Sequence, residues 1–368
     1  MKPKVLFVLP NLEPGGAERL VTMLLQHLPR ERLELHIALV ARYGLLLDRI
    51  PDDVQVHHLR AGRVRRVAYP LLRLAWRLRP DLVLSTLGYM NLALIPLWPF
   101  LPGGTRLYVR EANTLSAEVQ TFPRAGVWKA AYRALYPRAD GIVCPARAMA
   151  ADLVENFGIP PRSIRYIPNP VDMDLIEQST GGENPFRGPG PHVLGVGRLV
   201  PQKGFDLMIE AFALLAEKID SAQLWVMGEG PERAALEQRA DELGVAPRVH
   251  LVGHVPIPYP WMRHADVFVL SSKFEGLPNV VLEAIACGTR VAAFDSPGGT
   301  REILEHVAEE ILVPFGDIQG LADAMASLIE LGNGPPPPLP DEYGLSAVVQ
   351  AYTNLFCESD GQGDASLR

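Results

Sequence analysis

Two carboxylates in this chain, Glu275 and Glu283, are spaced so that both can serve one ligand. The sequence Gly-Leu-Pro-Asn between them cannot form regular structure, whereas VVLEAIACG predicts a helix that ends at Gly288. Glu275 should therefore lie in a loop, and Glu283 about one turn into the helix. The helix N-terminus between them is suited to a phosphate, because its first N–H groups lack helical acceptors. Since carboxylates repel phosphate, we expect the glutamates to accept hydrogen bonds from hydroxyl groups, such as those of a nucleotide's sugars.

A second loop carries two cations. In GRLVPQKGFD, Arg198 and Lys203 stand on either side of a Pro-Gln turn, directly after a predicted buried strand. Two cations in this position can hold a diphosphate and stabilise it as it leaves. The alternative is a pair of surface cations beside a helix start, but their position at the carboxyl end of a strand favours the binding role.

Two glycine-rich turns also follow predicted strands. NLEPGGAERL contains Gly15 and Gly16, and VMGEGPERAALE contains Gly228 and Gly230. Glycine allows a backbone to approach a ligand closely, although an ordinary strand-to-helix turn would explain either pair. The first turn lacks the G-x-G-x-x-G spacing, which disfavours a nicotinamide cofactor.

The elements that must position these loops are apolar strands alternating with helices. In the first half of the chain we expect strands at 5–10, 35–40, 81–86, 106–111 and 140–145, and a short strand that runs into the Pro-rich turn of SIRYIPNPVD. In the second half we expect them at 193–197, 223–228, 249–253, 266–271 and 290–294. Two such series predict an α/β fold with two doubly wound parallel sheets, in which ligands lie beyond the carboxyl ends of the strands.

Segments rich in glycine and proline predict the domain boundaries of the chain. We expect a first domain at 1–178, a Gly- and Pro-rich linker at 179–191, a second domain at 192–338, a helix at 339–357 and a disordered tail at 358–368. The sequence GPPPPLP at 334–340 should break the last helical run of the second domain, and the final helix should return to the first domain.

Composition limits the class of protein. A length of 368 residues is too great for one ordinary core and suits two domains. Three widely spaced cysteines favour neither a disulfide framework nor a zinc site, and so indicate a reducing, cytoplasmic compartment. The N-terminus MKPKVLFVLP predicts a buried strand rather than a secretory signal, and the apolar run 90–102 is too short to span a membrane.

The charge is unevenly distributed. Residues 1–177 hold 23 Lys and Arg against 16 Asp and Glu, a net +7, whereas residues 178–368 hold 12 against 26, a net −14. The segment 60–79 places arginines around leucines and Trp76 at helical spacing, and 124–138 repeats the pattern. We expect 60–79 to lie on an anionic membrane surface, the alternative being a solvated helix face. Nucleic acid is not an expected partner, because the chain is acidic overall and has no recognition motif.

Together, these motifs closely resemble those of the retaining glycosyltransferases of family 4. The resemblance covers nearly the whole chain and rests on PGGAER, IPNPVD, GRLVPQKGFD, GEGPER and, above all, the E-x7-E motif of FEGLPNVVLEA. It implies the GT-B fold, in which two Rossmann-like domains face each other across a cleft. The first domain would bind the acceptor and the second the nucleotide sugar.

The resemblance also implies roles for single residues. Arg198 and Lys203 would bind the donor diphosphate, Glu283 the ribose hydroxyls, and Glu275 the transferred sugar. The loop of Gly15 would reach over the donor or acceptor, and LVGHV would lie near the base. The expected donor-binding residues are Gly15, Gly16, Gly197, Gly228, Gly230, Gly253, His254, Val255, Gly276, Leu277, Pro278, Asn279, Val280 and Glu283.

One departure from the family concerns the first domain. Many relatives place a histidine there to face the anomeric carbon, but this chain has VREANTLS, with Arg110, Glu111 and Asn113. A similar Arg-Glu-x-Asn sequence in members that transfer hexosamines favours an N-acetylhexosamine donor. Glu111 would act in catalysis by orienting the acceptor hydroxyl or taking its proton, or would be a structural carboxylate paired with Arg110.

Asp172 and Asp174, two aspartates separated by one residue, resemble the motif with which the other glycosyltransferase fold binds a divalent metal ion. They follow a Pro-rich hinge, away from the predicted phosphate loops, so we expect at least one of them to cap a helix. Since Arg198 and Lys203 already supply positive charge, we expect no metal and no other cofactor.

The predicted activity is retaining transfer of a hexose or N-acetylhexosamine from a nucleotide sugar, with UDP as the expected nucleotide. The resemblance is to members that build bacterial lipid-linked oligosaccharides, capsules and O-antigens, which implies a polyprenyl-diphosphate-linked or other lipid-linked saccharide as acceptor, at the inner face of the plasma membrane. Two alternatives are a nucleotide-sugar epimerase of the same fold, which needs no membrane patch, and a non-catalytic sugar-nucleotide-binding subunit.

Overall fold

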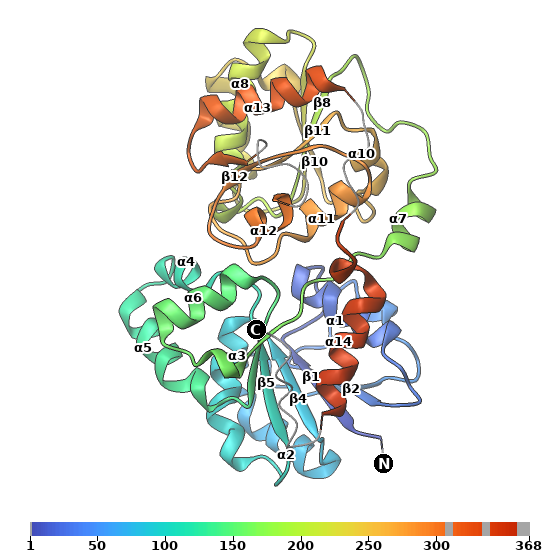
Figure 1. Cartoon of the computed structure of the whole chain (residues 1–368), viewed down its shortest axis with the longest axis vertical. Helices are drawn as coiled ribbons and strands as arrows, with labels where there is room; N and C mark the ends of the chain where they lie inside the picture. Colours follow the sequence, from blue (N-terminus) through green and yellow to red (C-terminus); the bar gives the residue numbers. More distant parts are fainter. Residues whose placement is uncertain (1, 306–311, 333–338, 359–368) are drawn as a thin grey trace. The chain divides into compact units, whose positions relative to one another are not determined.

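The chain folds into two compact units (Figure 1). The computed structural model describes residues 2–305, 312–332 and 339–358. One unit comprises Met1–Pro170 with Ser346–Arg368, and the other comprises Val171–Leu345.

The boundary between the units falls after Pro170, earlier than the predicted end of the first domain at residue 178. Helix α7 (Met173–Ser179) packs on helices of the second unit, which explains the difference. The predicted linker 179–191 therefore lies within the second unit, ahead of its first strand.

A seven-stranded parallel sheet forms the centre of the first unit. Its strands are β1 (Lys4–Leu9), β2 (Glu34–Leu39), β3 (Gln55–His58), β4 (Leu82–Thr86), β5 (Arg106–Arg110), β6 (Gly141–Cys144) and β7 (Ile164–Tyr166). Their order is β3-β2-β1-β4-β5-β6-β7, so the direction of winding reverses between β1 and β4. The run VLFVL in β1 is buried, as a parallel sheet covered on both faces requires.

Helices connect these strands. They are α1 (Gly16–His27), α2 (Ala68–Leu78), α3 (Gly88–Leu94), α4 (Leu115–Gln120), α5 (Ala125–Leu135) and α6 (Arg147–Phe157), with the 3-10 helix η3 (Ile95–Phe100) after α3.

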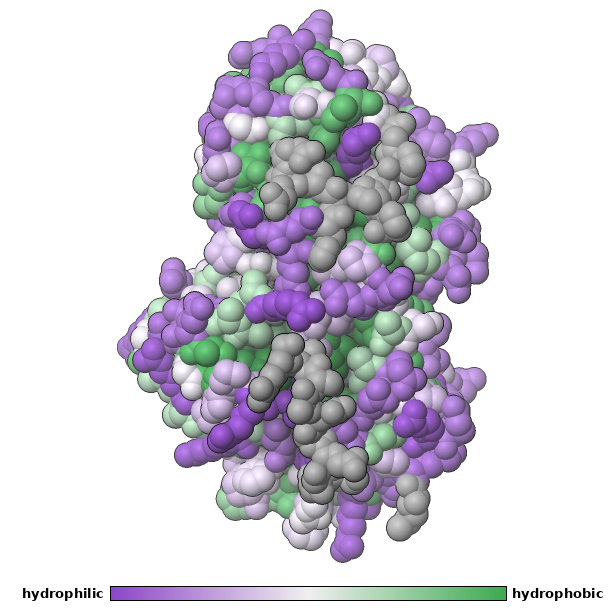
Figure 2. Space-filling view, viewed as in Figure 1, coloured by the Kyte–Doolittle hydropathy of each residue, from purple (hydrophilic) through white to green (hydrophobic). Residues whose placement is uncertain are grey.

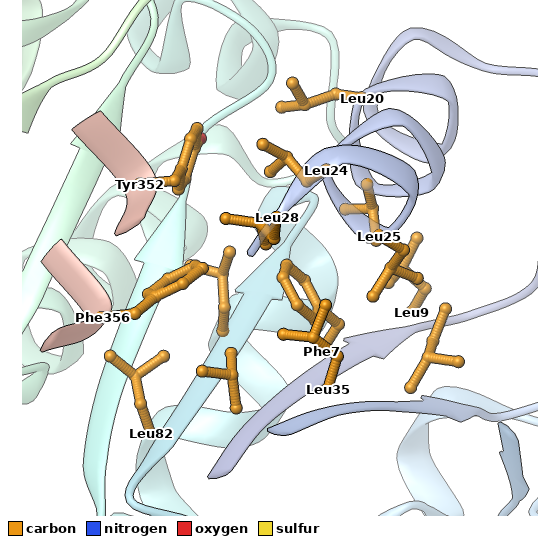
Figure 3. Packing of buried hydrophobic residues seen from close by; sticks show 14 of the residues in the cluster. Phe7, Leu9, Leu20, Leu24, Leu25, Leu28, Leu35, Leu82, Tyr352 and Phe356 are labelled. Atoms are coloured by element: carbon orange, nitrogen blue, oxygen red, sulfur yellow. The ribbon is translucent and has the colours of Figure 1, made fainter. Parts of the chain in front are cut away.

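The last helix, α14 (Leu345–Cys357), packs on the sheet of the first unit, as predicted. Tyr352 and Phe356 of α14 point into the apolar cluster that includes Leu24 of α1 (Figure 3). The rings of Phe7 and Phe356 meet edge to face, with centroids 5.8 Å apart. Burial of these aromatic residues ties the C-terminal helix to the N-terminal strand.

A six-stranded parallel sheet forms the centre of the second unit. Its strands are β8 (His192–Val196), β9 (Gln223–Met227), β10 (Val249–Gly253), β11 (Val267–Leu270), β12 (Val291–Asp295) and β13 (Leu312–Pro314). The order β10-β9-β8-β11-β12-β13 reverses its winding between β8 and β11. Its helices are α7, α8 (Phe205–Lys218), α9 (Arg233–Glu242), α10 (Tyr259–His264), α11 (Asn279–Ala286), α12 (Thr300–Leu304) and α13 (Ile318–Leu331).

The predicted fold class, two parallel-sheet α/β domains, is confirmed. Short strands β3 and β13 were not predicted, since each offers only a few apolar residues. The predicted helix break at 334–340 falls largely outside the described residues, as does the predicted tail beyond Glu358. On the face shown in Figure 2, polar side chains predominate on each unit, and smaller apolar areas are scattered among them.

Candidate functional site

The loops that follow β8, β9 and β10 are joined by backbone hydrogen bonds. The N–H of Gly197 donates to Met227 (2.9 Å), that of Leu199 to Glu229 (2.9 Å), and that of Gly228 to Gly253 (2.8 Å). These bonds extend the sheet pattern beyond the strand ends. The carboxyl edge of the second sheet is therefore a connected platform of loops.

Gly228 and Gly230 are required by this platform. A Cβ at Gly228 would stand 1.8 Å from the carbonyl oxygen of Gly197, and one at Gly230 would stand 2.2 Å from that of Leu199. Gly228 also has a φ of +146°, which side chains rarely permit. The structure thus supports the alternative reading of this turn, since both glycines admit another backbone segment of the same chain.

The two predicted cations lie at opposite ends of the β8–α8 loop. Arg198 is exposed and forms no ion pair with any other described residue. Lys203 ends the 3-10 turn η6 (Pro201–Lys203), and its methylene chain lies over Gly197. Gly204 follows with a φ of +61°, where a Cβ would stand 2.2 Å from the carbonyl oxygen of Ser271.

Lys203 and Glu275 form an ion pair. Nζ of Lys203 lies 2.5 Å from Oε1 of Glu275, and the hydroxyl of Ser272 donates to the same oxygen at 2.6 Å. Their side chains are only 18 % and 7 % exposed. The structure therefore brings together two of the predicted site residues from different loops. The sequence analysis did not single out Ser272, although it lies three positions before Glu275 and directly after a predicted strand.

The loop after β12 supports the Glu275 loop. The N–H of Glu275 donates to Pro297 (2.9 Å), and that of Gly299 donates to Gly276 (2.6 Å). Gly298 has a φ of +131°, and a Cβ there would stand 2.5 Å from the carbonyl oxygen of Glu275. Sequence reasoning also missed this loop, whose signal is Pro-Gly-Gly just after a predicted strand.

Glu283 lies one turn into α11, as predicted, and is buried. The helix begins at Asn279 and ends before Gly288, whose φ is +87°. The hydroxyl of Tyr259 lies 3.4 Å from Oε1 of Glu283. In the first turn of α11, immediately after the Glu275 loop, the N–H of Val281 donates to the carbonyl oxygen of Pro278 at 3.0 Å. The N–H groups that precede it at the helix start have no carbonyl earlier in the helix to accept them. Cationic, carboxylate and N–H groups are thus present along one edge of the sheet.

The remaining donor-site candidates of the second unit follow the same edge. Gly276, Leu277 and Pro278 are buried, while Asn279 and Val280 are partly exposed. After β10, Gly253 adopts a φ of +91°, His254 is exposed and Val255 is partly exposed.

Three candidates belong to the first unit instead. Gly15 precedes α1 with an ordinary φ of −107°, and Gly16 is the exposed first residue of that helix. A Cβ at Gly15 would stand 2.3 Å from Oε2 of Glu18, the end of a flexible side chain. The third candidate is Glu111.

Glu111 follows β5 and is buried among uncharged partners. Its Oε1 accepts hydrogen bonds from the hydroxyl of Tyr136 and from Nδ2 of Asn91, the latter at 3.2 Å. Its Oε2 has no hydrogen-bond partner among the described residues. Burial raises the pKa of Glu111 to about 8, against the opposing effect of the Tyr136 hydrogen bond. At neutral pH the group is mostly protonated, so it is better suited to donate a hydrogen bond than to take a proton.

The predicted alternative of a pair between Arg110 and Glu111 is wrong. Nη2 of Arg110 donates to Oδ1 of Asn169 at 2.5 Å. Neighbouring side chains of an extended segment point to opposite faces, which separates Arg110 from Glu111.

Asp172 caps α7, as expected. Its carboxylate accepts a hydrogen bond from the N–H of Leu175 at 3.0 Å. Within residues 2–305, 312–332 and 339–358, no group of three or more His, Cys, Asp and Glu side chains is placed to hold a metal ion.

The basic segment 60–79 forms α2 and the turn before it. The leucines of this helix do not all face outward, because Leu71, Leu74 and Ala75 are buried in the first unit. Tyr69 and Trp76 are 74 % and 55 % exposed, and they share the outer surface with Arg73. The apolar part of any membrane contact would therefore be aromatic.

Comparison with known protein families gives two matches. The family model described as Glycosyltransferase Family 4 matches residues 14–175, and the model described as Glycosyl transferases group 1 matches residues 190–331. The two matches fall on the two units in turn.

Two relatives illustrate the range of named activities. The N-acetylgalactosamine-N,N'-diacetylbacillosaminyl-diphospho-undecaprenol 4-alpha-N-acetylgalactosaminyltransferase of Campylobacter jejuni is 28 % identical over 331 residues, covering 87 % of this chain and 88 % of that protein. The GDP-mannose-dependent alpha-(1-6)-phosphatidylinositol monomannoside mannosyltransferase of Mycobacterium tuberculosis is 33 % identical over 187 residues, covering 47 % of this chain and 48 % of its own.

Among solved structures, Anabaena HepE in complex with UDP and glucose is similar. Its TM-score is 0.72 at 22 % identity, and the match covers 96 % of this chain and 95 % of that one. The similarity shows the shared GT-B fold of two parallel-sheet α/β units.

Proposed function

The chain belongs to the glycosyltransferases of group 1 and family 4, and on that premise we propose that it transfers a hexose or N-acetylhexosamine from a nucleotide sugar to a lipid-linked saccharide. The observation that carries this proposal is the arrangement around Lys203, whose ammonium group pairs with Glu275 beside the first turn of α11. Such an edge offers a cation, N–H donors and carboxylates to a ligand that has both phosphates and hydroxyls.

The donor would bind along the loops of the second unit. Arg198 and Lys203 would hold the diphosphate, and the first turn of α11 would add N–H donors to it. Glu283 would accept hydrogen bonds from the ribose hydroxyls, and Glu275 from the transferred sugar. UDP is the proposed nucleotide; it is supported by the fold shared with HepE, which binds UDP, although the mycobacterial relative is named for GDP-mannose.

In the proposed reaction, the bond between the anomeric carbon and the diphosphate oxygen breaks. The electron pair passes to the diphosphate, and the acceptor oxygen forms the new bond on the same face of the sugar, with retention. The proton of the acceptor hydroxyl passes to the departing diphosphate. Arg198, Lys203 and the N–H groups of α11 would stabilise the departing charge, which is the largest demand of this step. Because two cations supply that charge, we propose transfer without a metal ion.

The chemical class of the acceptor is proposed by analogy with the Campylobacter relative. Its name describes a saccharide carried on undecaprenol diphosphate, and we propose a polyprenyl-diphosphate-linked or similar acceptor here. Glu111, mostly protonated at neutral pH, would orient the acceptor by donating a hydrogen bond from its carboxyl group. An acceptor of this kind is held in a membrane.

The proposed membrane contact is the outer surface of α2. Arg73, Tyr69 and Trp76 are exposed on α2, and Arg63, Arg65 and Arg66 are exposed in the turn directly before it. Basic and aromatic side chains are the types that bind the anionic interface of a bilayer. Across the described part of the chain, no helix has the length and apolarity that a membrane crossing needs. We therefore propose a peripheral enzyme at the inner face of the plasma membrane.

Binding of UDP, GDP and uridine to variants tests the donor site. We expect Glu283→Gln to weaken binding of both UDP and uridine, by about tenfold, because it removes the charged acceptor for the ribose hydroxyls. Arg198→Ala should weaken UDP but leave uridine unchanged, since only UDP has a diphosphate. Calorimetry of purified protein measures both.

The control is Glu217→Gln, which neutralises an exposed glutamate of α8. It should bind UDP as the wild type does. If Glu283→Gln and the control bind UDP equally well, the ribose assignment is wrong, and if no nucleoside diphosphate binds the wild type, the proposed donor site is wrong.

A further inference from the structure

Ser272 stands at the centre of the Lys203–Glu275 pair, although no role in the family resemblance falls on it. It is 1 % exposed and directly follows Ser271, which begins the loop after β11. Its hydroxyl donates to Oε1 of Glu275 at 2.6 Å, and Lys203 donates to that same oxygen at 2.5 Å. One carboxylate oxygen thus serves two donors from two loops.

The neighbouring hydroxyl fixes the other partner of the pair. Oγ of Ser271 donates to the carbonyl oxygen of Lys203 at 3.0 Å. The N–H of Lys273 donates to Gln202 at 2.8 Å, which adds a further bond between the same loops. The backbone that carries Lys203 is therefore held in place independently of its ammonium group. The side chain can change its partner while the loop stays where it is.

A diphosphate and Glu275 would compete for Lys203. An ammonium group that pairs with a carboxylate must loosen that contact to bind a phosphate at full strength. Glu275 is 5 % exposed, and a buried carboxylate that loses a hydrogen-bond donor pays a desolvation penalty. A hydroxyl that stays on the carboxylate lowers that penalty.

We infer that Ser272 is a positioning residue of the proposed donor site. Its hydroxyl holds Glu275 in the absence of donor and remains a hydrogen-bond donor to Glu275 when Lys203 turns to the donor's diphosphate. The inference rests on the proposed function, because the exchange of partners requires a nucleoside diphosphate at Lys203. Without the Ser272 hydroxyl, Glu275 depends more on its ion pair with Lys203. Lys203 is therefore less available to bind the diphosphate.

The test is a double-mutant cycle on UDP affinity. Ser272→Ala should weaken UDP binding by about tenfold, because release of Lys203 then leaves Glu275 with fewer donors. In a Glu275→Gln background, where the residue at 275 no longer carries a charge that competes for Lys203, Ser272→Ala should leave UDP affinity unchanged. Ser272→Thr, which keeps the hydroxyl, should restore most of the affinity.

A matched control is Ser85→Ala in the first unit. Ser85 lies in β4 and is fully buried, but its hydroxyl has no hydrogen-bond partner among the described residues. This variant should bind UDP as the wild type does. The melting temperature of every variant is measured in parallel, so that a loss of folding is seen separately from a loss of affinity.

Two outcomes overturn the inference. Unchanged UDP affinity in Ser272→Ala would show that the hydroxyl does not influence Lys203. An equal loss of affinity with Glu275 and with Gln at position 275 would show that Ser272 acts only through the shape of the loop. Wild-type protein that binds neither UDP nor GDP would instead overturn the proposed function, so the two failures are distinguishable.

Discussion

Glu275 and Glu111 are both buried glutamates, but their partners differ. Glu275 has the ammonium group of Lys203 at 2.5 Å, whereas, within the part of the chain that the structure describes, Glu111 accepts hydrogen bonds from the uncharged groups of Tyr136 and Asn91. Burial raises the pKa of Glu111 to about 8, because it outweighs the opposing effects of the Tyr136 and Asn91 hydrogen bonds and of Arg110. The two glutamates therefore suit different proposed tasks, Glu275 as an acceptor for hydroxyls of the transferred sugar and Glu111 as a hydrogen-bond donor.

The protonation of Glu111 predicts how stability depends on pH. Its pKa is raised from 4.5 to about 8 in the folded protein, so between these values the folded state binds a proton that the unfolded state has released. Stability should therefore fall as the pH rises through this window, by at most about 1.4 kcal/mol per pH unit from this group. Thermal unfolding of the wild type and of Glu111→Gln between pH 5 and 9 measures it, since the amide does not titrate.

We expect the melting temperature of Glu111→Gln to fall less than that of the wild type over this range. Glu155→Gln, a change at an exposed position of α6 in the same unit, should follow the wild type. Parallel pH dependence of the wild type and Glu111→Gln would show that Glu111 is ionised throughout.

At the scale of elements, residues that start or end a helix made much of the candidate site predictable from the sequence. Pro278 and Gly288 bound the helix that carries Glu283, and both are visible in the sequence. The surroundings of Glu111 were not predictable, because Asn91 and Tyr136 lie 20 and 25 positions away along the chain. The sequence also left open whether Gly228 admits a ligand or another loop, since its partner Gly197 belongs to a different strand end.

The loop platform predicts an uneven tolerance of glycine substitutions. Gly228→Ala should lower the stability of the second unit by about 1–3 kcal/mol or more, because its Cβ meets the carbonyl of Gly197 and its φ is positive. Gly182→Ala in the same unit is the control, since no atom lies within 4 Å of its added Cβ. Chemical denaturation measures both, and equal stabilities would contradict the role of Gly228 in joining the loops.

At the scale of the whole molecule, the two halves of the sequence carry net charges of opposite sign. Residues 1–177 carry a net +7 and residues 178–368 a net −14. The positive half contains the exposed arginines of segment 60–79, and the negative half contains the proposed donor site with its two cations. A membrane-held acceptor is thus proposed for the basic half, which matches the negative potential of an anionic bilayer surface.

Replacement of Arg63, Arg65, Arg66 and Arg73 by serine should release the protein from anionic vesicles. Each basic residue near such a surface contributes about 1 kcal/mol, so binding should fall by more than a hundredfold. Replacement of the same four residues by lysine keeps the charge and should keep most of the binding. Co-sedimentation with vesicles that contain an anionic lipid measures both variants. Undiminished binding of the serine variant would place the membrane contact elsewhere.

The most direct measurement of the central claim is release of free nucleotide from a panel of UDP-, GDP- and ADP-sugars. It is made in EDTA, with and without polyprenyl-diphosphate-linked saccharides. We predict turnover of one UDP-hexose or UDP-N-acetylhexosamine only when the lipid-linked acceptor is present, with the sugar recovered on the lipid. Release of nucleotide without any acceptor product, or conversion of the donor to an epimer, would contradict the proposed transfer.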